Sequence, residues 1–187
     1  MLEEVGCDYT LEYVALKKGA HKTESFKAIN KMGKVPTLVD GEAVVSEVAA
    51  IGMYLADKFA PGRLAPALDV PERATYLRWI CYGPSVIEPG CVAKSSNWEF
   101  NAGSAGWGTW DEMLETIDAA IGEGPYLLGE TFSMADMLFG GTVGWMMAFG
   151  MLPKKPTWEA YIARLEERPA RVRAKEINAK VAAEQGL

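Results

Sequence analysis

The sequence predicts an α+β fold in which a small sheet-containing part comes first and an all-helical part follows. The Asp40-Gly41 pair separates two short apolar runs, 37–39 and 43–45, which is typical of a β-hairpin. After residue 70 the apolar residues recur at spacings of three and four, the period of amphipathic helices. The stretch between these parts is rich in proline and has neither period. We therefore expect one domain at residues 1–60, a linker at 61–70 and a helical domain at 71–187.

Composition is that of an ordinary globular protein. Of the 187 residues, 49% are hydrophobic and 24% are charged, which is enough apolar material for a substantial core. The net charge of −6 disfavours nucleic acid or an anionic membrane surface as a partner. Asp136 and four glycines interrupt the longest apolar stretch, 134–152, which predicts a buried helix and a loop rather than a membrane span. Met1 begins no secretory signal, so we expect a cytoplasmic protein.

The cysteines and the single histidine give no sign of a metal site. Cys7, Cys81 and Cys91 are odd in number and lack CxxC spacing, which disfavours both a disulfide framework and bound zinc. We expect each cysteine to be a small buried apolar residue. His21 lies in a basic loop, where a solvated side chain is the favoured interpretation. The alternative is that it faces a ligand carboxylate together with Lys17, Lys22 and Lys34.

The first thirty residues predict short local elements. Residues 1–5 are expected to be the last turn of a helix, with Gly6 as its left-handed cap. Tyr9–Leu16 alternates and is rich in β-formers, which predicts a strand. A basic loop over 17–23 and a short helix over 24–29 are expected to follow.

The stretch around Pro36 and the next helix start is the candidate binding site. A cis bond before Pro36 would cost only about 0.5–1 kcal/mol and would aim the amide and carbonyl of Val35 out of the sheet. A helix is expected to begin near Ser46 or Glu47, with apolar residues at spacings of three and four. Its first amides are free donors that suit a carboxylate. An ordinary hairpin followed by a capped helix explains the same pattern, and spacing alone favours that alternative.

The C-terminal half predicts several helices. Pro71 suits a helix's first turn, and Pro84 and Pro89 are expected to kink or end that helix. Residues 98–108 predict a loop or a weak helix. Ser133 followed by Asp136 forms a capping box before an apolar helix, which indicates a structural role. A stripe at helical spacing is interpreted as core plus part of a partner or substrate surface: Trp107, Trp110, Met113, Leu114, Ile117 and Ile121.

Two blocks of the chain resemble the motifs of one known family. The first is Asn30-Lys31-Met32-Gly33-Lys34-Val35-Pro36-Thr37-Leu38, similar to Asn-Pro-x-Gly-Lys-Val-Pro-x-Leu, with Lys31 replacing the first proline. Glu47-Val48-Ala49-Ala50-Ile51 follows and resembles an acid-Ser-x-Ala-Ile helix start without the serine. The second block, 129–136, is similar to Gly-x-x-Phe-Ser/Thr-x-Ala-Asp in a core helix. With these blocks the chain resembles the soluble glutathione transferases, of the bacterial type.

The resemblance implies a thioredoxin-like N-terminal domain followed by an all-α C-terminal domain. It implies an enzyme that conjugates or reduces electrophilic small molecules with the glutathione thiolate, glutathione being the co-substrate. Carried over by position, Lys34 meets the glycyl carboxylate, and Val35 with Pro36 pairs with the cysteinyl part. Glu47 and the amide of Val48 hold the γ-glutamyl end. The alternative function is a non-catalytic binding or protein-interaction module of the same fold.

The resemblance also implies that the family's first strand and catalytic loop are absent from this sequence, so no catalytic residue is named. In the family that strand is central, between the equivalents of Tyr9–Leu16 and of the strand after Pro36. Its loss would leave unpaired backbone groups that cost about 1–3 kcal/mol each where they are buried. We expect either a sequence that starts too late or a remodelled N-terminal domain.

The first two helices of the C-terminal part carry more apolar and aromatic side chains than one core needs. This excess predicts a two-fold homodimer. The resemblance implies an electrophile pocket between the domains, with Tyr82, Trp107 and Trp110 as candidate lining. The alternative for these three is core or dimer surface.

Overall fold

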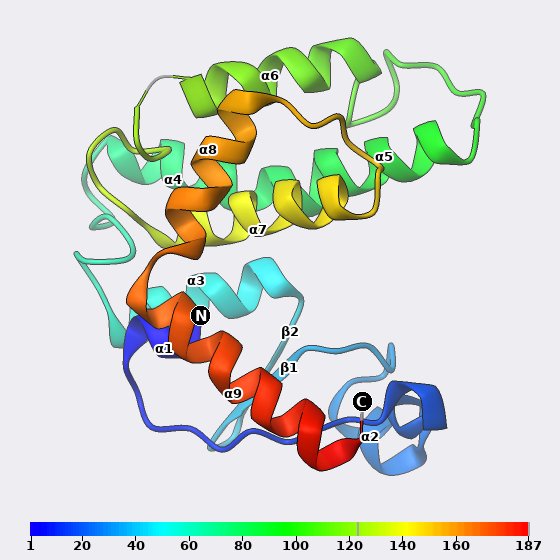
Figure 1. The fold of residues 1–187 in the computed structure, drawn as a ribbon, viewed down its shortest axis with the longest axis vertical. Coiled ribbons are helices and arrows are strands. Elements are labelled where there is room, and N and C mark those ends of the chain that lie inside the picture. Colours follow the sequence, from blue (N-terminus) through cyan, green and yellow to red (C-terminus); the bar gives the residue numbers. More distant parts are fainter. Residues whose placement is uncertain (123, 187) are drawn as a thin grey trace.

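The computed structural model describes residues 1–122 and 124–186, and Figure 1 shows them as two stacked parts. The hairpin, α1, α2 and α3 form the lower part, and α4 to α8 form the upper part. The last helix, α9, returns across the lower part. The α+β prediction is confirmed. The helices and strands are α1 (Leu2–Val5), α2 (Glu24–Ile29), β1 (Thr37–Asp40), β2 (Ala43–Ser46), α3 (Val48–Phe59), α4 (Glu72–Tyr82), α5 (Glu88–Ser95), α6 (Trp110–Gly122), α7 (Met134–Ala148), α8 (Pro156–Glu166) and α9 (Pro169–Gln185).

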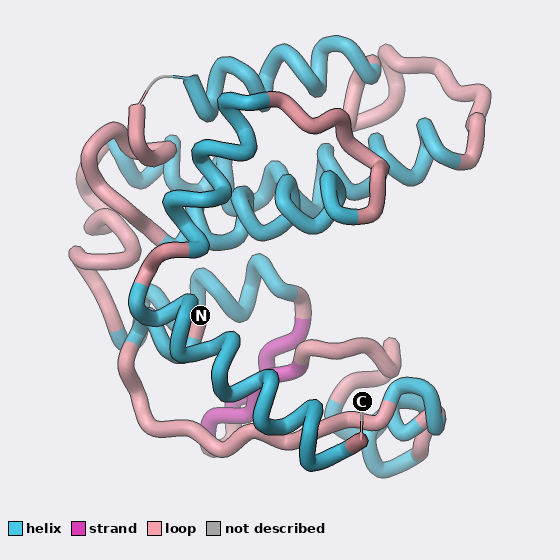
Figure 2. The backbone as a smooth tube through the Cα atoms, in the orientation of Figure 1, coloured by secondary structure: helices cyan, strands magenta, loops and turns pink. Residues whose placement is uncertain are grey.

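The hairpin forms where its turn signal predicts, with a shift of one residue. Thr37 pairs with Ser46, and Asp40 pairs with Ala43, so the two loop residues are Gly41 and Glu42. Gly41 has a φ of 60°, which glycine adopts without steric cost. Figure 2 shows these two strands as the sheet of the described chain.

The predicted strand over Tyr9–Leu16 is wrong. No backbone hydrogen bond joins residues 7–14 to the rest of the described chain, and Leu16 already belongs to a 3₁₀ turn, Leu16–Lys18. Figure 2 draws this segment as a long loop. A cavity of about 1580 Å³ lies between the segment, the edge of β1 and the end of α9. Alternation alone cannot make a strand, because a ladder needs a partner within hydrogen-bonding distance.

Two prolines in the upper part do not end the helix that contains them. α4 continues through a π-helical turn, Gly83–Ile87, into α5. Pro84 lies in the first turn of the π-helical segment and Pro89 in the first turn of α5. The change of hydrogen-bonding pattern at these starts accommodates the missing amide donors. Of the predicted kink or end, the helix end is not observed, because the chain continues through the π-helical turn into α5. Residues 98–108 are free of helix, which is one of the two alternatives predicted for them.

The core of the upper part is built around α7. Its apolar residues meet the faces of α4 and α8, and the largest fully buried side chains include Tyr76, Phe139, Trp158 and Tyr161. The predicted capping arrangement is present, because the amide and hydroxyl of Ser133 donate to Asp136 at 2.8 and 3.0 Å. None of the helices within residues 1–122 and 124–186 is long and apolar enough to cross a membrane.

The cysteines differ in burial. Cys91 is buried, and burial raises the pKa of its thiol to about 11. Cys7 is half-buried and Cys81 is exposed, so the prediction that all three are buried is wrong. Cys81 follows the fully buried Ile80 on α4, and adjacent helical residues point in different directions. In the described part of the chain, no group of three or more His, Cys, Asp or Glu side chains could hold a metal ion.

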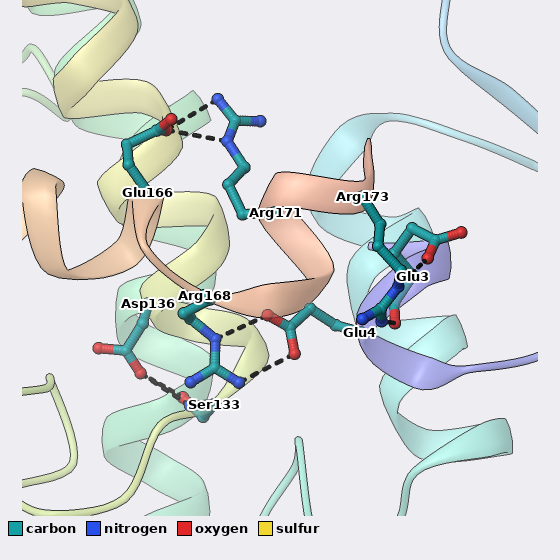
Figure 3. Close-up of polar contacts among 8 residues, drawn as sticks. All are labelled: Glu3, Glu4, Ser133, Asp136, Glu166, Arg168, Arg171 and Arg173. Atoms are coloured by element: carbon teal, nitrogen blue, oxygen red, sulfur yellow. Dashed lines mark hydrogen bonds and ion pairs between the residues drawn. The ribbon is translucent and has the colours of Figure 1, made fainter. Parts of the chain in front are cut away.

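The lower part is attached to the upper part by packing and by ion pairs. Within the stretch 61–70, Leu64 and Ala65 are buried, and the carbonyl of Leu64 accepts from the amide of Met134 at 2.8 Å. At the start of α9, arginines reach the glutamates of α1 (Figure 3). The N-terminal helix α1 is thereby held to the start of α9.

Candidate functional site

The register of the hairpin assembles the candidate site. Because Thr37 pairs with Ser46, Pro36 and Glu47 lie at the same open end of the hairpin, one residue beyond the last pair. Val35 and Val48 follow one residue further out on either side. The antiparallel pairing thus brings together two segments that the sequence separates by a whole hairpin. The Val35–Pro36 peptide bond is cis.

Glu47 has an unusual backbone conformation at the junction of β2 and α3. Its φ of 69° and ψ of 123° lie where a residue with a Cβ is rarely found. Such strain costs on the order of 1–3 kcal/mol and is concentrated at functional sites. The side chain of Glu47 is exposed, and no ion pair or hydrogen bond from the described residues engages it. Its carboxylate is therefore available to a cation.

The N-terminus of α3 presents free donors beside Glu47. The first intrahelical bond runs from the Ile51 amide to the Glu47 carbonyl at 2.9 Å, so the amides of Val48, Ala49 and Ala50 precede the ladder. No side chain caps them. Ser46 is the last residue of β2 and pairs with Thr37, whereas Glu47 is the N-cap of α3, so of the two predicted helix starts the one at Glu47 is confirmed. These amides and the helix dipole suit a carboxylate.

A buried asparagine holds the loop before Pro36. Asn30 is 6% exposed, and its Nδ2 donates to the Lys34 carbonyl at 3.0 Å and to the Thr37 hydroxyl at 3.2 Å. Its Oδ1 accepts from the Met32 amide at 3.1 Å. This role of Asn30 was not predicted from the sequence. A signal for this role is the tendency of an asparagine side chain to hydrogen-bond to the backbone two residues further on.

The neighbouring basic loop contacts this turn. Gly33 has a φ of 58°, and a Cβ there would lie 2.6 Å from the carbonyl oxygen of His21. Lys22 donates to the carbonyls of Met32 and Gly33 at 3.2 and 2.9 Å, so its ammonium is engaged in structure. His21 is half-buried rather than solvated, and its Nδ1 is buried. Gly33 is therefore required for both its conformation and the close approach.

The structure leaves all five predicted binding residues exposed: Lys34, Val35, Pro36, Glu47 and Val48. Val35 and Pro36 also line the large cavity, whereas the other three do not. The site offers the ammonium of Lys34, the exposed backbone of Val35, the carboxylate of Glu47 and the N-terminus of α3. These groups complement a short peptide that carries two carboxylates and one ammonium.

The predicted lining of an electrophile pocket is not brought together. Tyr82 packs on Trp79 and Phe139, with ring centroids 5.4 and 6.2 Å apart. Trp107 and Trp110 line a separate pocket of about 300 Å³ between α5 and α6, and Tyr82 is not part of its wall. Trp107 and Trp110 belong to the predicted stripe at helical spacing. In the rest of that stripe, Met113, Ile117 and Ile121 are buried in the core.

Family models match both parts of the chain. The model described as the N-terminal domain of glutathione S-transferase matches residues 1–58, and the corresponding C-terminal domain model matches residues 100–174. The fold is thus a thioredoxin-like N-terminal domain with a helical C-terminal domain.

Similar proteins come from plants, animals and bacteria. Glutathione S-transferase F14 of Arabidopsis thaliana is 27% identical over 90% of this chain and 74% of its own length. Human glutathione S-transferase theta-2 is 31% identical over 71% of this chain, but the match spans only 59% of that protein.

Solved structures give the same result. A glutathione transferase of Methylococcus capsulatus is 30% identical, with a TM-score of 0.75 over 95% of this chain and 90% of its own. A theta-class glutathione S-transferase of Xanthomonas axonopodis with glutathione bound is 34% identical, with a TM-score of 0.68 over 92% of this chain and 86% of its own. The chain therefore belongs to the glutathione transferase family, as the sequence motifs predicted.

Proposed function

We propose that this protein binds glutathione at the open end of the β1–β2 hairpin and acts as a glutathione transferase on an electrophilic small molecule. The observation that carries the proposal is the juxtaposition of Lys34, the Val35 backbone and Glu47 with the free amides of α3. The order of these groups matches the glycyl carboxylate, the cysteinyl residue and the γ-glutamyl end of glutathione. The bound glutathione in the 34% identical Xanthomonas structure supports the same ligand.

Each end of the tripeptide meets a group of opposite charge. The ammonium of Lys34 pairs with the glycyl carboxylate, and the carboxylate of Glu47 pairs with the γ-glutamyl ammonium. The amide of Val48 donates to the γ-glutamyl carboxylate at the positive end of α3. The backbone of Val35, next to Pro36, pairs with the cysteinyl residue as a neighbouring strand would. Val48 lacks a hydroxyl, which removes one hydrogen bond worth about 0.5–1.5 kcal/mol.

The chemistry proceeds through the glutathione thiolate. A free thiol has a pKa near 8.5, so it is mostly protonated at neutral pH and needs a stabilising donor. The thiolate attacks an electrophilic carbon, a sulfur–carbon bond forms and the leaving group departs with the displaced electron pair. We assign no side chain of this chain as the activating group.

The assembly and location proposed for this function are those of a cytoplasmic two-fold homodimer. Large apolar side chains remain exposed on the upper part, among them Trp98, Trp145 and Phe149 at 60–64%. Such exposure is typical of an interaction surface. Sedimentation velocity at micromolar protein should give a species of twice the 20.4 kDa chain mass. A single species of chain mass would contradict the dimer.

Thermal unfolding with added glutathione tests the binding site. Glutathione at a hundredfold over its dissociation constant should raise the free energy of unfolding by about 2.7 kcal/mol. Glu47→Gln should remove most of this gain, because the γ-glutamyl ammonium loses its charged partner. Glu42→Gln, in the exposed hairpin loop, is the matched control and should retain the gain. Val48→Ser should increase it by restoring a hydroxyl.

Two results would overturn parts of the proposal. A wild-type protein that unfolds cooperatively but shows no shift at millimolar glutathione would contradict the site. Binding of glutathione without conjugation of chlorodinitrobenzene, followed by absorbance, would leave a binding module and contradict the transferase activity.

A further inference from the structure

The chain carries its positive charge unevenly. Residues 16–34 contain six lysines and one glutamate, a net charge of +5, whereas the whole chain has a net charge of −6. We call residues 16–34 the basic lobe. All of its lysines are exposed: Lys17, Lys18, Lys22, Lys27, Lys31 and Lys34. The rest of the chain is correspondingly acidic.

Short-range contacts make the basic lobe one compact unit. Two 3₁₀ turns lead into α2, whose N-cap is Thr23. The ammonium of Lys22 donates to the carbonyls of Met32 and Gly33, which ties the start of the lobe to its end. Figure 1 shows α2 at the lower end of the molecule's long axis and α4 to α8 at the upper end. The lysines of the lobe therefore share one end of the molecule.

The protein itself does not neutralise these lysines. No ion pair among the described residues involves a lysine of the basic lobe, and Glu24 is the lobe's one carboxylate. The end of α9 lines the same cavity as α2, and residues 174–185 hold two lysines and two glutamates, which adds no net charge.

Screening makes the local charge more important than the overall charge. At physiological ionic strength the Debye length is about 8 Å, so the acidic residues of the helical part act weakly on a surface that the lobe touches. The net charge of −6 disfavours an anionic membrane for the chain as a whole. The basic lobe presents the opposite sign to whatever approaches this end of the molecule.

Aliphatic side chains are exposed among the lysines. Leu16 and Ile29 are each 47% exposed, and Met32 is 67% exposed. Leu16 and Ile29 also line the large cavity, whereas Met32 does not. The lobe contains no arginine, tryptophan or tyrosine, side chains that nucleic-acid-binding proteins use to pair with phosphates and to stack on bases. Lysines mixed with exposed aliphatic side chains instead suit the interface of an anionic bilayer.

We propose that the basic lobe is a docking surface for an anionic lipid bilayer. Its ammonium groups meet the lipid phosphates, and Met32 enters the interface beside them. The binding is peripheral and salt-dependent, because it rests mainly on charge. Lys22 is engaged by backbone carbonyls and Lys34 belongs to the candidate glutathione site. Four lysines of the lobe have neither role: Lys17, Lys18, Lys27 and Lys31. The proposal does not depend on the transferase function.

Co-sedimentation with lipid vesicles tests the proposal. At about 0.1 M salt the protein should bind vesicles of equimolar phosphatidylcholine and phosphatidylglycerol but not vesicles of phosphatidylcholine alone, and about 0.5 M salt should release most of it. Lys27→Gln/Lys31→Gln should lower the partition coefficient about thirtyfold, the equivalent of about 1 kcal/mol for each lysine. The control Lys94→Gln/Lys154→Gln removes the same charge from exposed positions of the helical part and should bind as the wild type does.

Met32→Ser separates the apolar contact from the charge. It should weaken binding at both salt concentrations, because apolar burial is not screened as ion pairing is. If Lys27→Gln/Lys31→Gln fails to fold, Lys17→Gln/Lys18→Gln makes the same comparison.

Three results would overturn the proposal. The first is no binding to the anionic vesicles at the lower salt concentration, and the second is equal binding by the lobe variant and its control. The third is binding of duplex DNA or polyglutamate without binding to vesicles, which would assign the basic lobe to a different polyanion.

Discussion

Arg168 donates from Nε and Nη2 to the two carboxylate oxygens of Glu4, at 2.6 and 2.9 Å, across 164 residues of sequence (Figure 3). The same guanidinium lies 3.4 Å from the centroid of the Phe132 ring. Glu4 is on α1, Arg168 immediately precedes α9, and Phe132 immediately precedes the Ser133 cap of α7. One side chain therefore connects α1 with the segments that precede α7 and α9.

We predict that Arg168→Lys lowers the free energy of unfolding by about 1–3 kcal/mol. A lysine cannot form two parallel bonds to a carboxylate or stack flat on a ring, and the Glu4 side chain is only 8% exposed. Urea unfolding measures the change. Arg171→Lys is the control, because Arg171 pairs with Glu166 at the surface, and it should cost less than about 1 kcal/mol. Equal losses in the two variants would contradict the prediction.

Asp136 is the polar centre of the helical core. Its side chain is fully buried and accepts bonds from the amides of Leu127 and Ser133, the Ser133 hydroxyl and the Tyr161 hydroxyl. Burial raises the pKa of Asp136, and these donors oppose that rise.

Asp136→Asn should therefore lower the free energy of unfolding by about 2–3 kcal/mol, because an amide nitrogen cannot accept and buried donors remain unpaired. Chemical denaturation measures this loss of stability. The control is Asp111→Asn, a change in the exposed first turn of α6. A loss no greater than that of the control would show that the network is not stabilising.

The carboxylate of Asp40 connects the hairpin to α3, so its protonation should change the stability of the protein. Lys58 and Tyr54 both donate to Asp40 Oδ2, and the bond from Lys58 is the main cause that lowers the pKa of Asp40. A lowered folded-state pKa contributes stability above the unfolded-state value near 3.9, and this contribution is lost as pH falls through the folded-state value.

The stability advantage of the wild type over Asp40→Asn should thus be present at neutral pH and disappear in acid. Urea titrations of both proteins between about pH 3 and 7 follow this difference. A difference that stays constant over the range would contradict the linkage.

Asn30 should matter for glutathione binding as well as for folding. Asn30→Ala removes its bonds to Met32, Lys34 and Thr37 and should lower the free energy of unfolding by about 1–3 kcal/mol. If the proposed site is correct, glutathione affinity should also fall, because the loop that carries Lys34 and Val35 is no longer held. Asn30→Asp keeps the acceptor for the Met32 amide but lacks the donors to Lys34 and Thr37. Calorimetry should therefore find that it binds glutathione as weakly as Asn30→Ala does. Wild-type affinity in both variants would rule out this positioning role.

Local chemistry allowed much of this protein to be predicted from its sequence. The Asp40-Gly41 signal, the Ser133–Asp136 capping box and the spacing of Met113, Ile117 and Ile121 act within a few residues, and the corresponding elements are confirmed. The family was predicted for a similar reason, because its motifs are short and contiguous.

Other features depend on neighbours that are distant in sequence, and only the tertiary structure decided them. Tyr9–Leu16 has the composition of a strand, but strand formation depends on pairing with another segment. The hydrogen bonds of Asn30 to the loop before Pro36 also depend on the turn that Gly33 permits beside His21. Arg168 and Glu4 carry no mutual signal over 164 positions, because a bidentate ion pair is specified by where the backbone places two side chains and not by their spacing.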